Sequence, residues 1–180
     1  MQLRIAGPDD AKQIALLHVD SWRRVYRGAY SDTYLDGDIV TDRLSVWSTR
    51  LAAPAHALTV VAEDDHTSLA GFIHVIFDED PRWGSLIDNL HVTHNRQRTG
   101  VGKTLLTNAA HAVVERATAR TVYLWVQEQN IAAQQFYRAM QGTYLERTPI
   151  TPPGGVPSRL TGTPHKLRFA WSDAALLADS

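Results

Sequence analysis

Apolar and polar residues alternate with a period of two along several short segments of the chain. This pattern is typical of β-strands that bury one face. Polar residues at 64–68 predict a hairpin turn between two of these segments, and residues 78–82 predict a second turn. The predicted strands are 2–6, 58–63, 69–77, a segment that ends at Val92, 121–126, 144–148 and 166–171.

Apolar residues recur at helical spacing between these strands. Asp9 or Asp10 can cap a first helix, whose buried face we expect to contain Ile14, Leu17, His18, Ser21, Trp22 and Val25. Further helices are predicted over 41–51, from Val101 to Val113 and after Asn130. Strands that alternate with helices predict an α/β fold with a mixed sheet. We expect a single domain over 1–172 and a short tail over 173–180.

The segment 149–164 breaks this pattern between the last two predicted strands. It contains five prolines and three glycines, which predict an irregular loop. Such a loop is either a plain connection or a lid, and the sequence favours the connection.

Composition and charge exclude several functions. The 180 residues include no cysteine, which excludes disulfides, thiol nucleophiles and cysteine-based metal sites. The first residues do not resemble a signal peptide, and no run approaches ~18 apolar residues, so we expect a cytoplasmic protein with no membrane partner. A net charge of -1 and a pI of about 6.7 argue against nucleic acid as a partner.

The stretch 88–106 combines a strand end, a polar turn and a helix start. Gly100 and Gly102 lie where helical spacing begins, and glycine lets a ligand approach the backbone closely. The first N–H groups of a helix have no partner within it and carry partial positive charge. No acidic residue occurs over 89–114, whereas the turn contains Arg96, Arg98 and Lys103. The sequence therefore predicts a pyrophosphate site.

Spacing separates the motifs that could bind such a phosphate. A Walker A loop needs a glycine where the chain has Gln97, and a dinucleotide fingerprint needs one where it has Leu105. The run from Gln97 to Gly102 instead resembles the Q/R-x-x-G-x-G/A signature of the GCN5-related N-acetyltransferases (GNAT). Residues 130–137, NIAAQQFY, resemble a second motif of that family, N-x-x-A-x-x-F-Y. His94 and Arg98 depart from the family's usual proline and glycine without removing a needed amide.

The resemblance implies a GNAT-like fold, with a mostly antiparallel twisted sheet that is splayed at its middle strands and has helices on both faces. It implies that the cosubstrate is acetyl-CoA, that no metal is needed, and that a second partner is an amine acceptor. The backbone N–H of Val92 would stabilise the developing oxyanion. The cofactor-binding residues that it implies are Leu90, His91, Val92, Gln97, Arg98, Thr99, Gly100, Val101, Gly102, Lys103, Asn130 and Tyr137.

Acetyl transfer to an amine needs a proton donor for the leaving thiolate and a route for the amine proton. Tyr137 is the expected acid, because it follows Asn130 by two helical turns and a phenol can protonate sulfur. Asp88 is the candidate base, since it shares a predicted strand face with Leu90 and Val92. It could also be a paired surface carboxylate. Two further candidates on neighbouring strands, Glu63 and His74, cannot be ranked.

Several alternatives stay open. The acids Asp32, Asp36, Asp38 and Asp42 lie beside aromatic residues, which suits a cationic acceptor, or they form a solvated, helix-capping surface. His18 is expected in the core or the groove rather than as a catalyst. His91 and His94 are spaced three apart across a strand end with no third ligand nearby, which argues against a metal. A non-catalytic acetyl-CoA sensor is the competing function, and a homodimer is possible.

Overall fold

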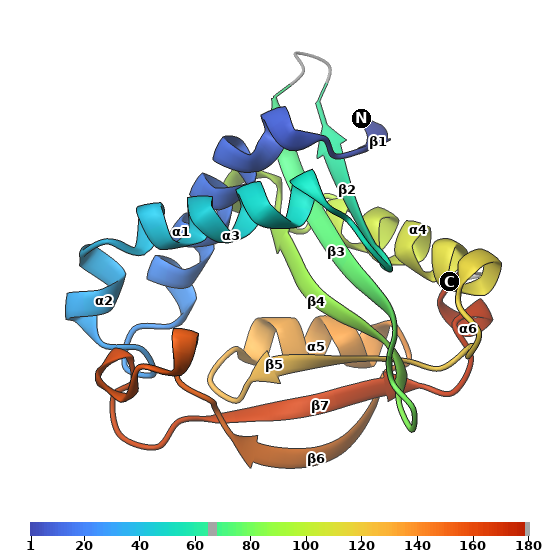
Figure 1. Ribbon diagram of the computed structural model, residues 1–180. Coiled ribbons are helices and arrows are strands. Elements are labelled where there is room, and N and C mark those ends of the chain that lie inside the picture. The colour runs from blue at the N-terminus through green and yellow to red at the C-terminus, as the bar shows by residue number, and fades with distance from the viewer. Residues whose placement is uncertain (65–67, 179–180) are drawn as a thin grey trace.

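The computed structural model describes residues 1–64 and 68–178, so the predicted turn at 64–68 lies mostly outside the described residues. The predicted strands and helices occur in the expected order, and two short helices, over 32–36 and 175–178, were not predicted (Figure 1). The strands are β1 (Gln2–Ile5), β2 (Ala57–Glu63), β3 (Leu69–Asp80), β4 (Gly84–Val92), β5 (Val122–Gln127), β6 (Thr143–Pro149) and β7 (His165–Trp171). The helices are α1 (Ala11–Val25), α2 (Asp32–Asp36), α3 (Ile39–Ala52), α4 (Val101–Arg116), α5 (Ile131–Ala139) and α6 (Ala175–Ala178).

The strands form one seven-stranded sheet in the order β1-β2-β3-β4-β5-β7-β6 within the described chain. β4 and β5 are parallel because α4 crosses over between them, and the other neighbouring strands are antiparallel. The β4–β5 pairing stops at Ile87 and Leu124, after which the two strands diverge (Figure 1). The predicted mixed, mostly antiparallel and splayed sheet is confirmed.

Helices cover both faces of the sheet, as the family resemblance implied. One face of β2 and β3 contributes Val61 and Phe72 to a cluster with Ile14 of α1 and Trp47 of α3. The other face contributes Val60 and Ile73 to the larger core, which also takes up the buried side of α4 and Tyr137 of α5. Figure 1 shows α1 and α3 together on one side, and α4 and α5 on the other.

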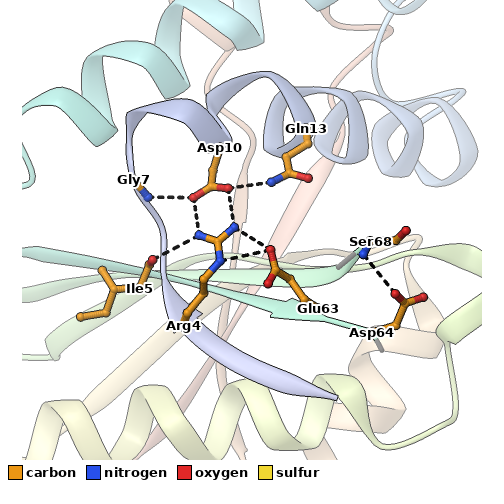
Figure 2. Close-up of polar contacts among 8 residues, drawn as sticks. All are labelled: Arg4, Ile5, Gly7, Asp10, Gln13, Glu63, Asp64 and Ser68. Atoms are coloured by element: carbon orange, nitrogen blue, oxygen red, sulfur yellow. Dashed lines mark hydrogen bonds and ion pairs between the residues drawn. The ribbon is translucent and has the colours of Figure 1, made fainter. Parts of the chain in front are cut away.

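An ion cluster fixes the start of α1 to the edge of the sheet (Figure 2). Arg4 donates to both carboxylate oxygens of Asp10, at 2.7 and 2.8 Å, and to Glu63 at 2.6 Å. The Arg4 guanidinium holds the pKa of the buried Asp10 carboxyl below its usual value. Asp10 is the N-cap residue of α1, as predicted, but its carboxylate accepts from the Gly7 N–H and the Gln13 side chain rather than from a backbone N–H of α1. Glu63 is thereby engaged in this structural cluster.

The chain end and one turn differ from the prediction. Residues 175–178 of the expected tail form α6, in which Leu177 is fully buried against the core and accepts a hydrogen bond from Thr107 of α4. Burial of the Leu177 side chain removes apolar surface from water. This burial stabilises the segment in its position against the core. β3 continues to Asp80, through the start of the predicted turn at 78–82.

The loop 149–164 contains two short 3-10 helices, Pro153–Gly155 and Pro157–Arg159. It is anchored on the segment between α1 and α2 by backbone hydrogen bonds. The Ser31 N–H donates to the Arg159 carbonyl, and the Thr161 N–H donates to the Ala29 carbonyl, both at 2.9 Å. This anchoring favours a fixed connection over a lid.

Candidate active site

A cavity of about 330 Å³ lies where β4 and β5 diverge. α1, α3 and α5 contribute to its walls, and Ile150 and Thr151 of the loop after β6 also line it. The cavity brings together five of the predicted site residues, namely Asp88, Leu90, His91, Asn130 and Tyr137. The splay in the sheet is therefore what creates the site.

The predicted phosphate turn lies outside the cavity lining, at the exposed start of α4. Gly100 has a φ of 92° and Arg98 a φ of 62°, so the chain bends through the left-handed region twice before the helix. Within the described part of the chain, no N–H group from Arg98 to Lys103 donates a hydrogen bond. The Thr104 N–H is the next to do so, to the Gly100 carbonyl at 3.0 Å. The turn thus presents a continuous run of free donors.

Side chains brace this turn. The Thr99 hydroxyl donates to the Arg96 carbonyl at 2.7 Å, and the Gln97 amide lies 3.5 Å from the Val92 carbonyl. Arg96 forms an ion pair with Asp64 at 2.9 Å, so it is partly neutralised. Arg98 and Lys103 make no ion pair with the described residues, and they supply the positive charge that the sequence predicted.

Gly102 connects the turn to the cavity. A Cβ placed on it would lie 3.6 Å from the Phe136 ring and 3.7 Å from Val92, which are ordinary contact distances. The start of α4 therefore packs beside the end of β4 and beside α5, one residue from Tyr137. The packing within the protein would therefore tolerate a Cβ at position 102. We infer that glycine at this position leaves space for a ligand.

The free edge of β4 faces the splay. The Thr93 N–H donates to the carbonyl of Ala70 in β3, and hydrogen-bonding direction alternates along an antiparallel strand. His91 therefore directs its backbone groups toward β3, whereas Leu90 and Val92 direct theirs toward the gap. These are two of the three β4 residues predicted to bind the cofactor.

Tyr137 is buried in the cavity wall. Its ring packs on Phe136, Phe169 and Trp171, with centroids 5.3, 6.0 and 6.3 Å away. Burial raises the pKa of the phenol above its ordinary value of 10, so the hydroxyl stays protonated at neutral pH. The hydroxyl makes no hydrogen bond with the described residues, which leaves its proton available to a ligand.

Asn130 precedes α5 rather than belonging to it. Its side-chain oxygen accepts the Ala133 N–H at 3.1 Å, which makes Asn130 the N-cap. Asn130 and Tyr137, which the sequence separates by two helical turns, both line the cavity. The oxygen is used by the cap, whereas the Nδ2 group stays free for a ligand.

Asp88 is the extra residue of a β-bulge in β4, because Asn89 pairs with His74 and Ile87 pairs with Val75. The bulge interrupts the alternation, so Asp88 faces α3 and not the side of Leu90. The face predicted for Asp88 was wrong. Its Oδ2 accepts from Arg50 at 2.7 Å and from Asn89 at 2.6 Å, whereas Oδ1 has no partner among the described residues.

Buried neutral histidines form the α1 side of the cavity. His18 accepts the Trp47 indole N–H at its Nδ1, at 3.0 Å, so its proton lies on Nε2. Nε2 has no partner among the described residues, and burial holds the pKa of His18 well below 6.5. The His91 ring is 4.6 Å away, and burial lowers its pKa to about 4.

His94 lies apart, on the exposed 3-10 helix His94–Arg96. Across the described residues, no group of three or more histidine, cysteine or acidic side chains could hold a metal ion. In the same part of the chain, no helix is both long and apolar enough to cross a bilayer.

Sequence reasoning missed the cations of the cavity, which are Arg43, Arg50 and Lys166. A signal existed, because Arg43, Trp47 and Arg50 follow one another at spacings of four and three on α3, which places them on one helical face. Of the four acids that suited either a cationic acceptor or a solvated surface, three are paired with arginines, and Asp38 makes no ion pair with the described residues. Asp32 and Asp36 bind Arg27 at 2.7 and 2.6 Å, and Asp42 binds Arg43 at 2.7 Å.

Comparisons with known proteins agree with this geometry. The model of the acetyltransferase (GNAT) family matches residues 19–142. The uncharacterized N-acetyltransferase YuaI of Bacillus subtilis is 29% identical over 130 residues, which are 71% of this chain and 72% of that protein.

Solved structures share the fold at lower identity. PaiA N-acetyltransferase from Thermoplasma acidophilum, in complex with coenzyme A, superposes with a TM-score of 0.68 at 19% identity over 95% of this chain and 100% of its own. YncA from Salmonella typhimurium, with its cofactor acetyl-CoA, gives 0.66 at 17% identity over 95% and 92%. Because the family match spans more than half of the chain, this protein belongs to the acetyltransferase (GNAT) family.

Proposed function

We propose that this protein is an N-acetyltransferase that transfers the acetyl group of acetyl-CoA to a primary amine by direct attack. The observation that carries the proposal is the run of unbonded N–H groups from Arg98 to Lys103, which leads past Gly102 and along β4 to the Tyr137 hydroxyl. Family membership and the coenzyme complexes of PaiA and YncA support it. They favour an enzyme over a sensor. A cytoplasmic location and a homodimer stay predictions.

The residues present fit the coenzyme. The free N–H groups and the positive end of α4 suit the two charges of a pyrophosphate. The backbone groups of Leu90 and Val92 that face the splay suit the amides of the pantetheine arm, as does the free Nδ2 of Asn130. Gly102 leaves space for the coenzyme beside Phe136.

The reaction uses three groups at the inner end of this path. The amine nitrogen attacks the thioester carbonyl while Asp88 Oδ1 takes a proton from it, and the Val92 N–H stabilises the developing oxyanion. As the C–N bond forms, the C–S bond breaks and Tyr137 donates its proton to sulfur. The chain contains no cysteine, so no acetyl-thioester enzyme intermediate is available.

Replacing the tyrosine tests this assignment. We expect Tyr137→Phe to lower kcat about 100-fold, because the leaving thiolate loses its acid. The Kd for CoA should change less than about twofold, since the ring and the phosphate turn are unaltered. Thiol release with acetyl-CoA and a panel of primary amines measures kcat, and calorimetric titration measures the Kd.

Tyr144→Phe is the matched control, because Tyr144 is exposed on β6 and lies outside the cavity. It should leave both quantities unchanged. If the purified protein does not bind CoA, the proposed function is wrong. If it binds CoA and Tyr137→Phe keeps full turnover, only the role of the acid is wrong.

A further inference from the structure

The acceptor end of the cavity has an excess of positive charge. Its cationic side chains are Arg43, Arg50 and Lys166, and among the described lining residues Asp88 is the only carboxylate. Asp88 is already paired with Arg50. Arg43 and Lys166 are therefore the cations whose charge the cavity itself does not balance.

Lys166 stands at the start of β7 with its ammonium 4.4 Å from the centre of the Trp125 ring. Its ammonium makes no ion pair or hydrogen bond with the described residues. Partial burial, and then the charge of Arg168, lower the pKa of Lys166, and the more weakly acting charge of Asp88 raises it. A partly buried ammonium without an anion is costly, and a bound anion would offset that cost.

Arg43 is only partly satisfied. Its Nε and Nη2 donate to Asp42 at 3.0 and 2.7 Å, and its guanidinium lies 4.9 Å from the centre of the Trp22 ring. Nη1 makes no hydrogen bond within the described chain. Asp42 is also shared with Arg159 at 3.4 Å, so one carboxylate serves two guanidinium groups. Arg43 therefore has one free donor, Nη1, and its positive charge is only partly neutralised.

A third free donor lies on the same side. His18 is 2% exposed, and its protonated Nε2 has no partner in the described structure. Buried donors in native proteins are rarely left unpaired, so this one calls for an acceptor atom from outside the chain. Besides the Tyr137 hydroxyl and Asn130 Nδ2 assigned above, the free groups of the cavity include donors on His18, Arg43 and Lys166, the acceptor Asp88 Oδ1 and the buried Gln127 amide, which has one donor and one acceptor end.

We propose that the amine acceptor also carries a carboxylate, which Arg43 and Lys166 bind while its amino group meets Asp88. The acceptor class is therefore a small amino acid rather than a polyamine or a basic peptide. The inference rests on the proposed function. The same cations favour the neutral form of the amine, because nearby positive charge lowers the pKa of an ammonium group. Nucleophilic attack requires that neutral form.

Matched pairs of compounds test the carboxylate directly. Each of several L-amino acids, spanning small, apolar, aromatic and acidic side chains, is compared with its own carboxamide on CoA-saturated protein. Binding is followed by tryptophan fluorescence, since Trp22 and Trp125 line the cavity, and turnover by thiol release from acetyl-CoA. For at least one pair, we expect the acid to bind about tenfold or more tighter than its amide, the loss typical of one charge-assisted hydrogen bond.

Two variants locate the contact. Lys166→Met and Arg43→Gln should each reduce the preference for acid over amide several-fold while the Kd for CoA is unchanged. Lys166→Met is the safer of the two, because Arg43 also helps to hold Asp42. Lys12→Met is the matched control, since Lys12 is exposed on α1 and outside the cavity. It should leave the preference as it is.

The outcomes separate the two proposals. Amides that bind as well as their acids, for every pair, overturn the carboxylate inference even if amines are acetylated. Acids that bind selectively without any thiol release uphold the inference and contradict the proposed function. A preference that survives both cavity variants shows that the carboxylate is bound elsewhere, which also overturns it.

Discussion

The two ends of the cleft are built from different parts of the chain. At the coenzyme end, one continuous stretch offers its backbone N–H groups from Arg98 to Lys103, and its side chains mainly brace the turn. At the acceptor end, side chains from α1, α3, β4, β5 and β7 meet in one cavity. A site made of local backbone leaves a short motif in the sequence, whereas a site made of distant side chains does not.

The largest expected effect is a loss of unfolding free energy at acid pH, which we expect to come from the histidines on the acceptor side. His18 and His91 line the cavity, and His74 packs on Trp47 of α3. Burial lowers the pKa of all three, to about 4 for His74 and His91. In the unfolded chain a histidine has a pKa near 6.5, so acidification protonates the unfolded state first. Stability is therefore complete above pH 6.5 and is lost as the pH falls toward 4. Each histidine should cost about 2 kcal/mol of unfolding free energy between pH 7 and pH 5.

Urea unfolding at a series of pH values measures this loss. His74→Gln should reduce the change in unfolding free energy between pH 7 and pH 5 by the contribution of one histidine, because glutamine does not titrate. Glutamine is chosen because it keeps a polar group beside the Thr59 hydroxyl, which lies 2.8 Å from His74 Nδ1. His111→Gln is the control, since His111 is exposed on α4. An unfolding free energy that does not change from pH 7 to pH 5 would contradict the neutral, buried state assigned to these histidines.

The sequence was sufficient for the parts that depend on local pattern. Spacing over Gln97 to Gly102 identified the turn, and the period-two segments identified all of the strands. It was insufficient where the fold overrides the pattern. The bulge at Asp88 reversed the face of that residue, and the pattern did not show that Asn130 caps the helix that follows it. No local rule brings Lys166 of β7 near Arg43 of α3, because only the splay between β4 and β5 makes them neighbours of one cavity.

The second largest effect is expected from a substitution that changes the backbone at the coenzyme end of the cleft. Gly100 has a φ of 92°, and a Cβ placed on it would meet nothing within 4 Å. The Cβ of Gly100→Val therefore causes no clash, but the substitution strains the backbone by about 1–3 kcal/mol and shifts the N–H groups around it. We expect the affinity for CoA to fall about thirtyfold in calorimetric titrations.

Gly155→Val is the matched control for that strain. Gly155 also has a positive φ, of 72°, with open space around its Cβ position, but it belongs to the loop 149–164 at the acceptor end. It should lose a similar amount of stability and bind CoA normally. If the two variants bind CoA equally well, the N–H groups of the turn do not hold the diphosphate.

The smallest expected effect concerns the charge of the turn. Lys103 is exposed and makes no ion pair with the described residues, so solvent and salt screen its ammonium. Lys103→Met should weaken CoA binding by no more than about fivefold at low ionic strength, the range of an exposed ion pair. That difference should disappear near 1 M salt, where the Debye length is about 3 Å, whereas the loss in Gly100→Val should persist. If Lys103→Met weakens binding more than Gly100→Val does, side chains hold the coenzyme after all, and the two ends of the cleft are built alike.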